Sequence, residues 1–408
     1  MKPLGPIPPG YDAIDGELSV GDHRASQLVE AAGGTPLFVY SRAHLHACVA
    51  GLRAAMPPGL AIHYAVKANP FGLLLDEMRG LVEGFDIASG GELAIVQKAG
   101  VDAALVSFAG PGKRDEELEA AMTAGVTINL ESEGETARAL ALASRLNVRP
   151  RLAIRVNPDF ELRGLGMKMG GGAKPFGVDA DRVPSLARRV IESGADWQGL
   201  HIFAGSQALS AEALIEAQAK VLALAARLAQ EIGAPLPKLN MGGGYGIPYF
   251  AGDAPLDITA IGHALNDAMK NRAEVLRHTA FCIELGRYLV GEAGIYLTRI
   301  VDRKTSHGET YLITDGGLHH QLAASGNFGT VVRRNYPVAI ASRFDAPPEE
   351  TANIVGCLCT PLDRLADKAF VPRAEVGDLV AVFCAGAYGA SASPSAFLGQ
   401  GPAREILV

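Results

Sequence analysis

Residues 61–70, AIHYAVKANP, form a short apolar run that ends in a single lysine, Lys67. The run over 61–66 predicts a buried strand, so Lys67 stands where that strand leaves the core. A lysine is rarely buried without a partner or a task. Two interpretations fit this position: a surface lysine whose stem lies along apolar surface, or a neutral amine held in a pocket and able to form a Schiff base.

Seven further runs of the same kind follow, and amphipathic stretches separate them. Alanine and leucine recur at helical spacing in those stretches, for example over 114–125, 134–146 and 211–233, and the pattern predicts helices that end near glycine. Strands that alternate with helices over about 250 residues are typical of a (β/α)8 barrel, although a doubly wound sheet also fits the pattern. The further strands are expected at 84–88, 104–108, 126–130, 151–156, 198–203, 237–241 and 280–285.

The pattern changes after about residue 292. Segments at 294–304, 310–317, 333–342, 350–359 and 377–389 read as strands separated by turns, without a strong helical pattern. We therefore expect a second, all-β domain. The predicted division is an N-terminal segment 1–34 that joins the β domain, a barrel over 35–292, and the C-terminal β domain over 293–408.

Composition narrows the class of protein. The net charge of −7 comes without basic blocks, so a nucleic-acid partner is not expected. No apolar stretch reaches the roughly 18 residues of a spanning helix, and the first residues lack the pattern of a signal peptide. The five cysteines are few and odd in number, and their spacing fits neither a disulfide framework nor a zinc site. We expect a cytoplasmic protein without a structural metal or a membrane segment.

Chemistry in a barrel collects at the carboxyl ends of the strands. The glycine run in 240–249, NMGGGYGIPY, would let backbone amides approach an anion closely, or it is simply a tight turn. The segment 284–287, ELGR, offers an acid suited to a pyridine nitrogen and an arginine suited to a phosphate, or an ordinary ion pair. The residues at predicted strand ends are Lys67, Asp86, Arg155, His201, Phe203, Gly242, Gly243, Gly244 and Glu284.

A lysine amine, a phosphate cradle and such a carboxylate are together what pyridoxal phosphate requires. With these parts in place, the chain resembles the decarboxylases of the alanine-racemase fold (fold type III), which include diaminopimelate, ornithine and arginine decarboxylases. The matching segments stand in the family's order and cover nearly the whole length. They are YAVKANP, FDIASGGEL, IRVNPD, GLHIFAGSQ, NMGGGYGIP, ELGRYLVGEAG, CLCTPLDRL and AGAYGAS.

The resemblance implies a role for each matching residue. Lys67 would bind pyridoxal phosphate through a Schiff base and later return a proton, and Glu284 would pair with the pyridine nitrogen. Cys359 would enter from a partner subunit and protonate the product carbon, which implies a homodimer with composite active sites. Asp86, Glu92 and Arg155 would shape the cofactor pocket. The phosphate would be held by Ser206, Gly242, Gly243, Gly244, Arg287 and Tyr388.

Three positions depart from the diaminopimelate enzymes of this family. Thr360 replaces the glutamate that grips the distal ammonium, and Ala323 falls where an arginine binds the distal carboxylate. Phe203 replaces a histidine that stacks on the cofactor ring; an aromatic ring can still stack, or Phe203 belongs to the core. His201 reads as a packed strand histidine. His319 and His320 could replace the lost anchors, or they are solvated loop residues.

The CTP run at 359–361 resembles a subgroup that acts on aminoacyl groups tethered to a carrier protein. The opening MKPLGPIPPG is most similar to the branch associated with exosortase A systems. A tethered substrate would lack the distal charges that the missing residues bind, and the basic pair in 331–337 would suit an acidic carrier protein or is an ordinary solvated turn. The alternatives are a decarboxylase acting on free diaminopimelate, an amino-acid racemase, and a non-catalytic pyridoxal phosphate carrier.

Overall fold

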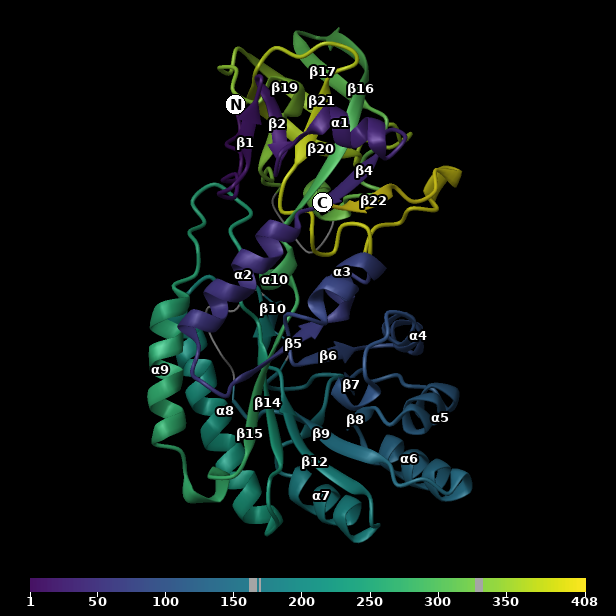
Figure 1. Cartoon of the computed structure of the whole chain (residues 1–408), viewed down its shortest axis with the longest axis vertical. Coiled ribbons are helices and arrows are strands. Elements are labelled where there is room, and N and C mark those ends of the chain that lie inside the picture. The colour runs from purple at the N-terminus through teal and green to yellow at the C-terminus, as the bar shows by residue number, and fades with distance from the viewer. Residues whose placement is uncertain (161–166, 169, 327–332) are drawn as a thin grey trace. The chain divides into compact units, whose positions relative to one another are not determined.

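The computed structural model describes residues 1–160, 167–168, 170–326 and 333–408. The chain divides into two compact units. The barrel unit contains Val49–Gly246 and Leu256–Gly286, and the β unit contains Met1–Cys48, Ile247–Pro255 and Arg287–Val408. Figure 1 shows the chain with its helices and strands labelled.

The barrel unit is built on eight parallel strands that close on themselves. The last strand pairs with the first, β15 with β5, and the fourth pairs with the fifth, β8 with β9. A doubly wound sheet has free edges, so this ring excludes it and confirms the predicted (β/α)8 barrel. In order around the ring the strands are β5 (Ala61–Ala65), β6 (Gly84–Ile87), β7 (Val106–Phe108), β8 (Thr127–Leu130), β9 (Arg151–Asn157), β12 (Asp196–Ile202), β14 (Lys238–Gly243) and β15 (Ala280–Leu285).

Helices follow the strands and surround the ring (Figure 1). Two predicted helices end at a left-handed glycine, Gly125 and Gly233, but the helix predicted over 134–146 ends at Asn147 with φ of 55°. Asparagine tolerates this conformation better than other non-glycine residues do. The helices are α3 (Gly72–Met78), α4 (Gly90–Lys98), α5 (Asp115–Ala124), α6 (Glu133–Leu146), α7 (Val183–Glu192), α8 (Ala211–Ile232) and α9 (Ile258–Lys270).

Short elements decorate the barrel. The strand β11 (Val178–Asp179) extends the sheet beside β9, and β10 (Met167–Lys168) pairs with β13 (Gly205–Ser206). The run predicted as a strand from residue 104 begins instead as a single helical turn, because Asp102 caps the amide of Ala104. The short helical turns are η1 (Val66–Ala68), η2 (Ala103–Leu105) and η3 (Glu274–Leu276).

The β unit is mostly sheet, as predicted. Its main sheet has the order β18-β21-β16-β17-β19-β20, with β4 pairing to both β16 and β22. A smaller sheet of β1 (Asp12–Ile14), β2 (Glu17–Val20) and β3 (His23–Arg24) lies near the N-terminus. The larger sheet contains β4 (Leu37–Tyr40), β16 (Gly294–Ser306), β17 (Glu309–Thr314), β18 (Val338–Ile340), β19 (Glu350–Val355), β20 (Arg364–Val371), β21 (Leu379–Val382) and β22 (Arg404–Leu407).

The boundary expected between residues 34 and 35 differs from the boundary in the structure. Residues 37–40 read as the start of the barrel, but they form β4, which pairs with β16 and β22. The apolar side chains of β4 are buried in the core of the β unit together with Ile295 and Phe383. The other helices and turns are α1 (Ala25–Ala31), α2 (Arg42–Ala55), α10 (Arg287–Val290), η4 (Leu322–Ser325), η5 (Ala341–Arg343) and η6 (Phe397–Gly399).

Within the described ranges, no helix has the length and apolar character needed to cross a membrane.

Candidate active site

A cavity of about 180 Å³ lies in the barrel unit where the strands end. Most of the residues predicted at strand ends line it, although they come from five different strands or the turns directly after them. Loops after β7 and β9 complete the wall with Gly110, Pro111 and Phe176. The predicted residues in the lining are Lys67, Asp86, Arg155, His201, Phe203 and Glu284.

Lys67 and Glu284 face one another in this cavity. Lys67 lies in the turn η1 directly after β5, and Glu284 lies on β15, the neighbour of β5 in the ring. Lys67 Nζ is 4.0 Å from Glu284 Oε1. Burial raises the pKa of Glu284, but His201, Lys67 and Arg155 outweigh burial and lower that pKa to about 2. Glu284 therefore keeps its negative charge throughout the neutral range.

His201 lines the cavity, although the sequence predicted no catalytic role for it. The sequence pattern placed it as a packed strand histidine, and it is indeed buried on β12. Its Nε2, however, lies 3.0 Å from Glu284 Oε2. Neither of these two atoms has a hydrogen-bond partner among the described residues. A buried carboxylate oxygen in that state is suited to a donor supplied by a ligand.

Phe203 presents its ring to the same cavity. It follows β12, and its ring centre lies 5.6 Å from Lys67 Nζ. The ring is only partly buried and lines the cavity together with Lys67, so Phe203 is not simply a core residue. An apolar ring in this place can stack on a flat cofactor, but it offers no hydrogen bond.

The glycine run at the end of β14 lets three backbone segments come together. A Cβ atom on Gly244 would lie 2.3 Å from the carbonyl oxygen of Gly205, and one on Gly243 would lie 1.8 Å from that of Glu284. Gly242 and Gly244 also have φ of 68° and 90°, which L-residues rarely adopt. The run thus allows Ser206, next to Gly205, to lie beside Gly244, which gives it a packing role. Its anion-binding role stays a prediction.

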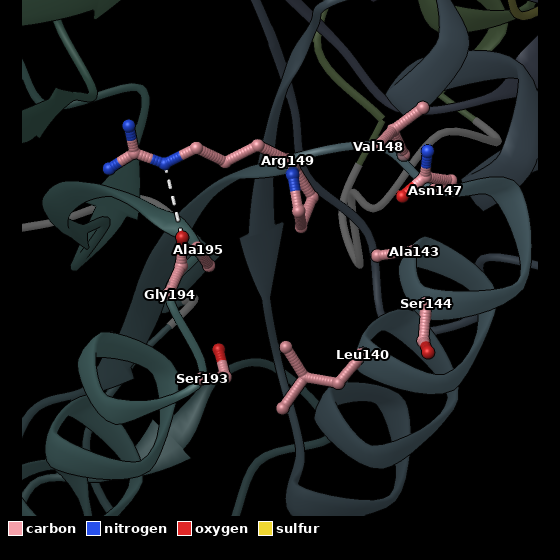
Figure 2. A pocket seen from close by; sticks show the side chains of 10 residues that line it. Leu140, Ala143, Ser144, Asn147, Val148, Arg149, Ser193, Gly194 and Ala195 are labelled. Atoms are coloured by element: carbon pink, nitrogen blue, oxygen red, sulfur yellow. Dashed lines mark hydrogen bonds between the residues drawn. The ribbon is translucent and has the colours of Figure 1, made fainter.

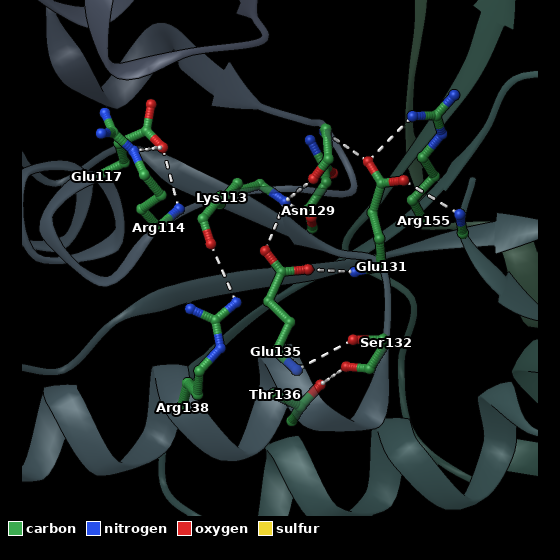
Figure 3. A network of polar contacts seen from close by, with 12 residues as sticks. Lys113, Arg114, Glu117, Asn129, Glu131, Ser132, Glu135, Thr136, Arg138 and Arg155 are labelled. Carbon is green, nitrogen blue, oxygen red and sulfur yellow. Dashed lines mark hydrogen bonds and ion pairs between the residues drawn. The ribbon is translucent and has the colours of Figure 1, made fainter. Parts of the chain in front are cut away.

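A buried acid holds Arg155 in place (Figure 3). Arg155 Nη1 lies 3.0 Å from Glu131 Oε1, and the Glu131 carboxylate also accepts from the amides of Gly110 and Gly177. Burial raises the pKa of Glu131, but Arg155 and Lys113 outweigh burial and lower that pKa below its usual value. One carboxylate therefore fixes Arg155 and both loops that carry cavity-lining residues.

A second buried pair supports the first. Lys113, whose side chain is 1% exposed, donates to Glu135 Oε1 at 2.7 Å and to the carbonyl oxygens of Gly110 and Asn129. Glu135 in turn accepts from the amide of Glu131, as Figure 3 shows. The Lys113 ammonium group therefore donates to three oxygen atoms, and such pairing is the condition for burying a charged group. No pattern in the sequence singled out Glu131, Lys113 or Glu135.

Two residues predicted to hold phosphate belong to the β unit. Arg287 donates to the hydroxyl of Tyr249 at 2.8 Å, and its guanidinium lies 4.8 Å from the ring centre of Tyr388. Burial raises the pKa of Tyr249 to about 12, so its hydroxyl stays neutral. Tyr388 has a positive φ of 58° in the turn that the sequence singled out. The phosphate role of Arg287 and Tyr388 stays a prediction.

The turn that contains Cys359 is exposed. Cys359 is a free thiol, and Thr360 closes the turn by donating its amide to Leu358 and accepting from the amide of Leu362. Asp363 is buried and accepts from the amides of Leu318 and Leu358. Its carboxylate therefore ties this turn to the segment after β17 and is not available as an anchor for substrate.

His319 and His320 are buried, so their interpretation as solvated loop residues is wrong. His320 contacts the Tyr296 hydroxyl at 3.0 Å and the carbonyl oxygen of Gly401 at 3.0 Å. Burial and the neighbouring His319 lower the pKa of His320 to about 4, and burial lowers that of His319. Neither imidazole carries a charge at neutral pH. Their role as substrate anchors stays a prediction.

Other cavities lie away from this chemistry. One of about 520 Å³ is formed by the end of α6 and the segment before β12, and none of the predicted site residues lines it. Figure 2 shows its residues, with Arg149 turned toward the carbonyl oxygen of Gly194. It lies where β9 begins, whereas the predicted site residues follow the ends of the strands.

The residues present fit pyridoxal phosphate. The 180 Å³ cavity brings together a lysine amine, an ionised carboxylate with an unpartnered buried oxygen, and an aromatic ring. Ser206 and the glycine run provide a hydroxyl and backbone amides in the same unit. These are the groups that a cofactor with an aldehyde, a pyridine nitrogen and a phosphate requires.

Comparison with known proteins also indicates a pyridoxal phosphate enzyme. Residues 42–291 match the family described as pyridoxal-dependent decarboxylase, pyridoxal binding domain. The chain belongs to this family. It is therefore a pyridoxal phosphate-dependent carboxy-lyase, which argues against the racemase and the non-catalytic carrier among the alternatives.

Relatives of two kinds match over almost the whole chain. The chain is 36% identical over 379 residues to the L-glutamyl-[BtrI acyl-carrier protein] decarboxylase of Niallia circulans, covering 91% of this chain and 88% of that one. It is 31% identical to the diaminopimelate decarboxylase of Archaeoglobus fulgidus, covering 98% and 93%. The structure of the Helicobacter pylori diaminopimelate decarboxylase complexed with L-lysine superposes with a TM-score of 0.80 at 25% identity, covering 92% and 91%.

Membership of the decarboxylase family indicates which reaction the site supports, the loss of CO2 from an amino-acid substrate. Pyridoxal phosphate, when bound, supplies the conjugated system that stabilises the negative charge left on carbon by the loss of CO2. The protein would then bind and orient the cofactor, with Lys67 as the predicted amine and Glu284, whose pKa is lowered to about 2, as the negative charge in the cavity. Arg155 is held rigidly by Glu131, which keeps the electrostatics of the cavity fixed.

Proposed function

We propose that this pyridoxal-dependent decarboxylase removes the α-carboxylate of an aminoacyl group tethered to a carrier protein. The observation that carries the proposal is the closed turn at Thr360. The residue that follows Cys359 is neutral, and its amide and hydroxyl are occupied within the turn by Leu358 and Leu362. This position therefore offers no charge to a distal ammonium group.

The neighbouring segment supports the proposal in the same way. Ala323, the position aligned with the carboxylate-binding arginine, lies in η4 and carries no charge. His319 and His320 are buried and have lowered pKa values, so they do not supply a positive charge at neutral pH. A distal acyl thioester is neutral and needs neither anchor, whereas free diaminopimelate carries both distal charges.

One cation does lie against this turn. Arg333 donates to the carbonyl oxygen of Leu362 at 3.3 Å, and burial lowers its pKa. Arg333 and the exposed Arg334 would meet an acidic carrier protein more readily than they would a small zwitterion. The relative from Niallia circulans acts, by its name, on a glutamyl group carried in this way, and we propose a glutamyl or similar short aminoacyl group here.

The assembly in this proposal is a homodimer. Cys359 is exposed and reduced, and it would serve as the acid that protonates the product carbon in the partner's site. We also propose, from the resemblance of residues 1–10, a role in an exosortase A-associated system. Free diaminopimelate remains the second candidate substrate because several relatives are diaminopimelate decarboxylases.

The experiment that tests the proposal compares substrates on one enzyme preparation. Release of CO2 is measured from purified protein loaded with pyridoxal phosphate, using free diaminopimelate, ornithine, lysine, arginine and glutamate, and then glutamyl-loaded carrier protein. The proposal predicts CO2 from the loaded carrier and at least about a hundredfold lower kcat/KM for each free amino acid. Equal or faster turnover of free diaminopimelate would contradict it.

A further inference from the structure

A second, smaller cavity lies inside the barrel on the side of the strand beginnings. It measures about 60 Å³, enough for a water molecule or two, and polar side chains dominate its wall. The interior of a barrel of this size is usually filled by branched apolar side chains. Its polar wall includes His63, Ser107, Asn129, Arg151, Gln198 and Lys238.

His63 connects this inner cavity to the cofactor cavity. Its Nδ1 lies 3.1 Å from Asp86 Oδ2, and its Nε2 lies 2.9 Å from Lys238 Nζ. Asp86 lines the cofactor cavity, whereas His63 and Lys238 line the inner one. The three side chains come from β5, β6 and β14 and form a continuous chain of hydrogen bonds.

The geometry determines which atom donates in the hydrogen bond between His63 and Asp86. Asp86 can only accept while it is ionised, so Nδ1 of His63 carries a proton and donates it. Nε2, the other ring nitrogen of His63, lies within hydrogen-bond distance of Lys238 Nζ. Burial lowers the pKa of His63, but Cys282 and Asp86 outweigh burial and raise that pKa to about 10.

Asp86 has one oxygen held and one oxygen available. Oδ2 accepts from His63, whereas Oδ1 is buried and has no hydrogen-bond partner within the part of the chain that the structure describes. The whole residue is 5% exposed. A buried carboxylate is costly without a donor, so the bond from His63 offsets part of that cost and also fixes the direction of the second oxygen.

The space for the His63 ring is built into the barrel. A Cβ atom at Gly84, the register partner of His63 on β6, would lie 2.5 Å from His63 Nε2. On the other side, β15 places Cys282 and Glu284 next to β5, and Glu284 is the register partner of His63. The titratable groups that face His63 are therefore Asp86 on β6, Lys238 on β14 and Cys282 with Glu284 on β15.

We propose that His63 is a positioning residue that fixes the Asp86 carboxylate, so that Oδ1 of Asp86 faces the bound cofactor as a rigid acceptor. Lys238, on the side of the inner cavity, holds the His63 ring in place through its contact with Nε2. The inference deepens the proposed function and rests on it only where turnover is measured. The ring acts through Asp86, since it lines the inner cavity rather than the cofactor cavity.

The test compares substitutions at both ends of the His63–Asp86 bond in the holoenzyme. His63→Phe keeps a ring but removes both hydrogen bonds, whereas His63→Asn keeps a nitrogen donor close to the place of Nδ1. Asp86→Asn removes the charge itself. The readouts are the absorption spectrum of bound pyridoxal phosphate, kcat and KM separately, and cofactor content and thermal unfolding as checks on folding.

We expect His63→Phe to change the cofactor spectrum in the direction of Asp86→Asn and to lower kcat about tenfold or more, with KM within about twofold. His63→Asn should restore the spectrum and bring kcat within about threefold of wild type. In the Asp86→Asn background, His63→Phe should add no further loss, because the two residues act as one unit. Independent, multiplying losses or an unchanged spectrum in His63→Phe would overturn the inference.

Lys238 is only partly buried, so its substitution should disturb folding less than substitution of His63 or Asp86. Lys238→Met should change the cofactor spectrum in the same direction as His63→Phe and by a smaller amount, and a spectrum identical to wild type would contradict the inference. The spectral readouts need no substrate. If no carrier-tethered group is turned over while the spectra change as expected, the proposed function fails and the inference stands.

Discussion

Lys67 follows strand β5 and Glu284 lies on β15, the neighbour of β5 in the closed barrel, and Lys67 Nζ is 4.0 Å from Glu284 Oε1. The ring closes because β15, the last strand, pairs with β5, the first. Residues separated by more than two hundred positions are therefore neighbours, and the cavity combines an amine with a carboxylate whose pKa is lowered to about 2. The predictions below test the parts of this arrangement in turn.

The glycine run can be tested by a matched pair of substitutions. Gly244 and Gly252 have φ of 90° and 89°. A Cβ atom at Gly244 would lie 2.3 Å from the carbonyl oxygen of Gly205, whereas no atom of the described residues would lie within 4 Å of one at Gly252. We expect Gly244→Ala to weaken pyridoxal phosphate binding by about tenfold or more. Gly252→Ala should lower the stability of the fold by only about 1 kcal/mol, the cost of a positive φ, and leave cofactor binding unchanged. Equal cofactor affinities in titrations of the two variants would show that close approach at Gly244 does not shape the phosphate site.

Glu131→Gln should lower stability in a pH-dependent way. The pKa of Glu131 is lowered in the folded protein, so its ionised form stabilises the fold above the pKa of an unfolded glutamate, and that contribution is lost as the pH falls through the folded value. We expect a loss of about 3 kcal/mol at pH 7, because the variant leaves Arg155 buried without its counter-charge. The measurement is the urea-dependent unfolding free energy of both proteins from pH 7 to pH 3.

The control for this prediction is Glu133→Gln. Glu133 is two residues away and only partly buried, and it pairs with Arg182 near the surface, so its removal should cost about 1 kcal/mol or less. A difference between wild type and Glu131→Gln that stays constant down to pH 3 would mean that the carboxylate charge of Glu131 is not what stabilises the fold.

Thr360→Glu should move the enzyme toward a free amino acid. The substitution restores a carboxylate at the position where the diaminopimelate enzymes have one, and it can pair with the distal ammonium. We expect kcat/KM for free diaminopimelate to rise about tenfold, and that for the carrier-tethered group to fall, as measured by CO2 release. Thr360→Val is the control, since it removes the hydroxyl without adding charge; an equal gain in both variants would exclude a role for the charge.

Composite active sites predict complementation between inactive variants. Lys67→Ala lacks the cofactor amine, and Cys359→Ala lacks the acid supplied by the partner, so each homodimer should be inactive or nearly so. Random heterodimers carry both defects in one site and leave the other site intact, so a mixture should recover about a quarter of wild-type CO2 release. Lys98→Ala, at an exposed lysine of α4, should behave as wild type. A mixture as inactive as its parents would contradict the proposed dimer.

The barrel could be predicted from the sequence because apolar runs and helical patterns can each be recognised within a short segment of the chain. Eight apolar runs separated by helical patterns correspond to eight paired strands, and residues at or directly after the ends of five of these strands line the cavity as predicted. The β4 segment was misplaced for a related reason. Residues 37–40 are an apolar run like the others, and only pairing with β16, more than 250 residues further on, assigns them to the β unit.

The supporting contacts could not be predicted in the same way. Lys113 and Glu135 look like ordinary charges of a surface helix and its loop, yet Lys113 is almost fully buried because three oxygens converge on its amine. His63 is one polar residue in a strand pattern, and its role depends on Gly84 and Lys238, which lie on two other strands. Such contacts depend on the register between strands, which periodicity does not report.

The measurement that tests the central claim most directly is the intact mass of a carrier protein loaded with a glutamyl group, before and after incubation with the holoenzyme. The account predicts that the mass of the loaded carrier falls by one CO2 and that the change is absent with Lys67→Ala. An unchanged carrier mass, under conditions in which the same preparation converts free diaminopimelate to lysine, would contradict the account.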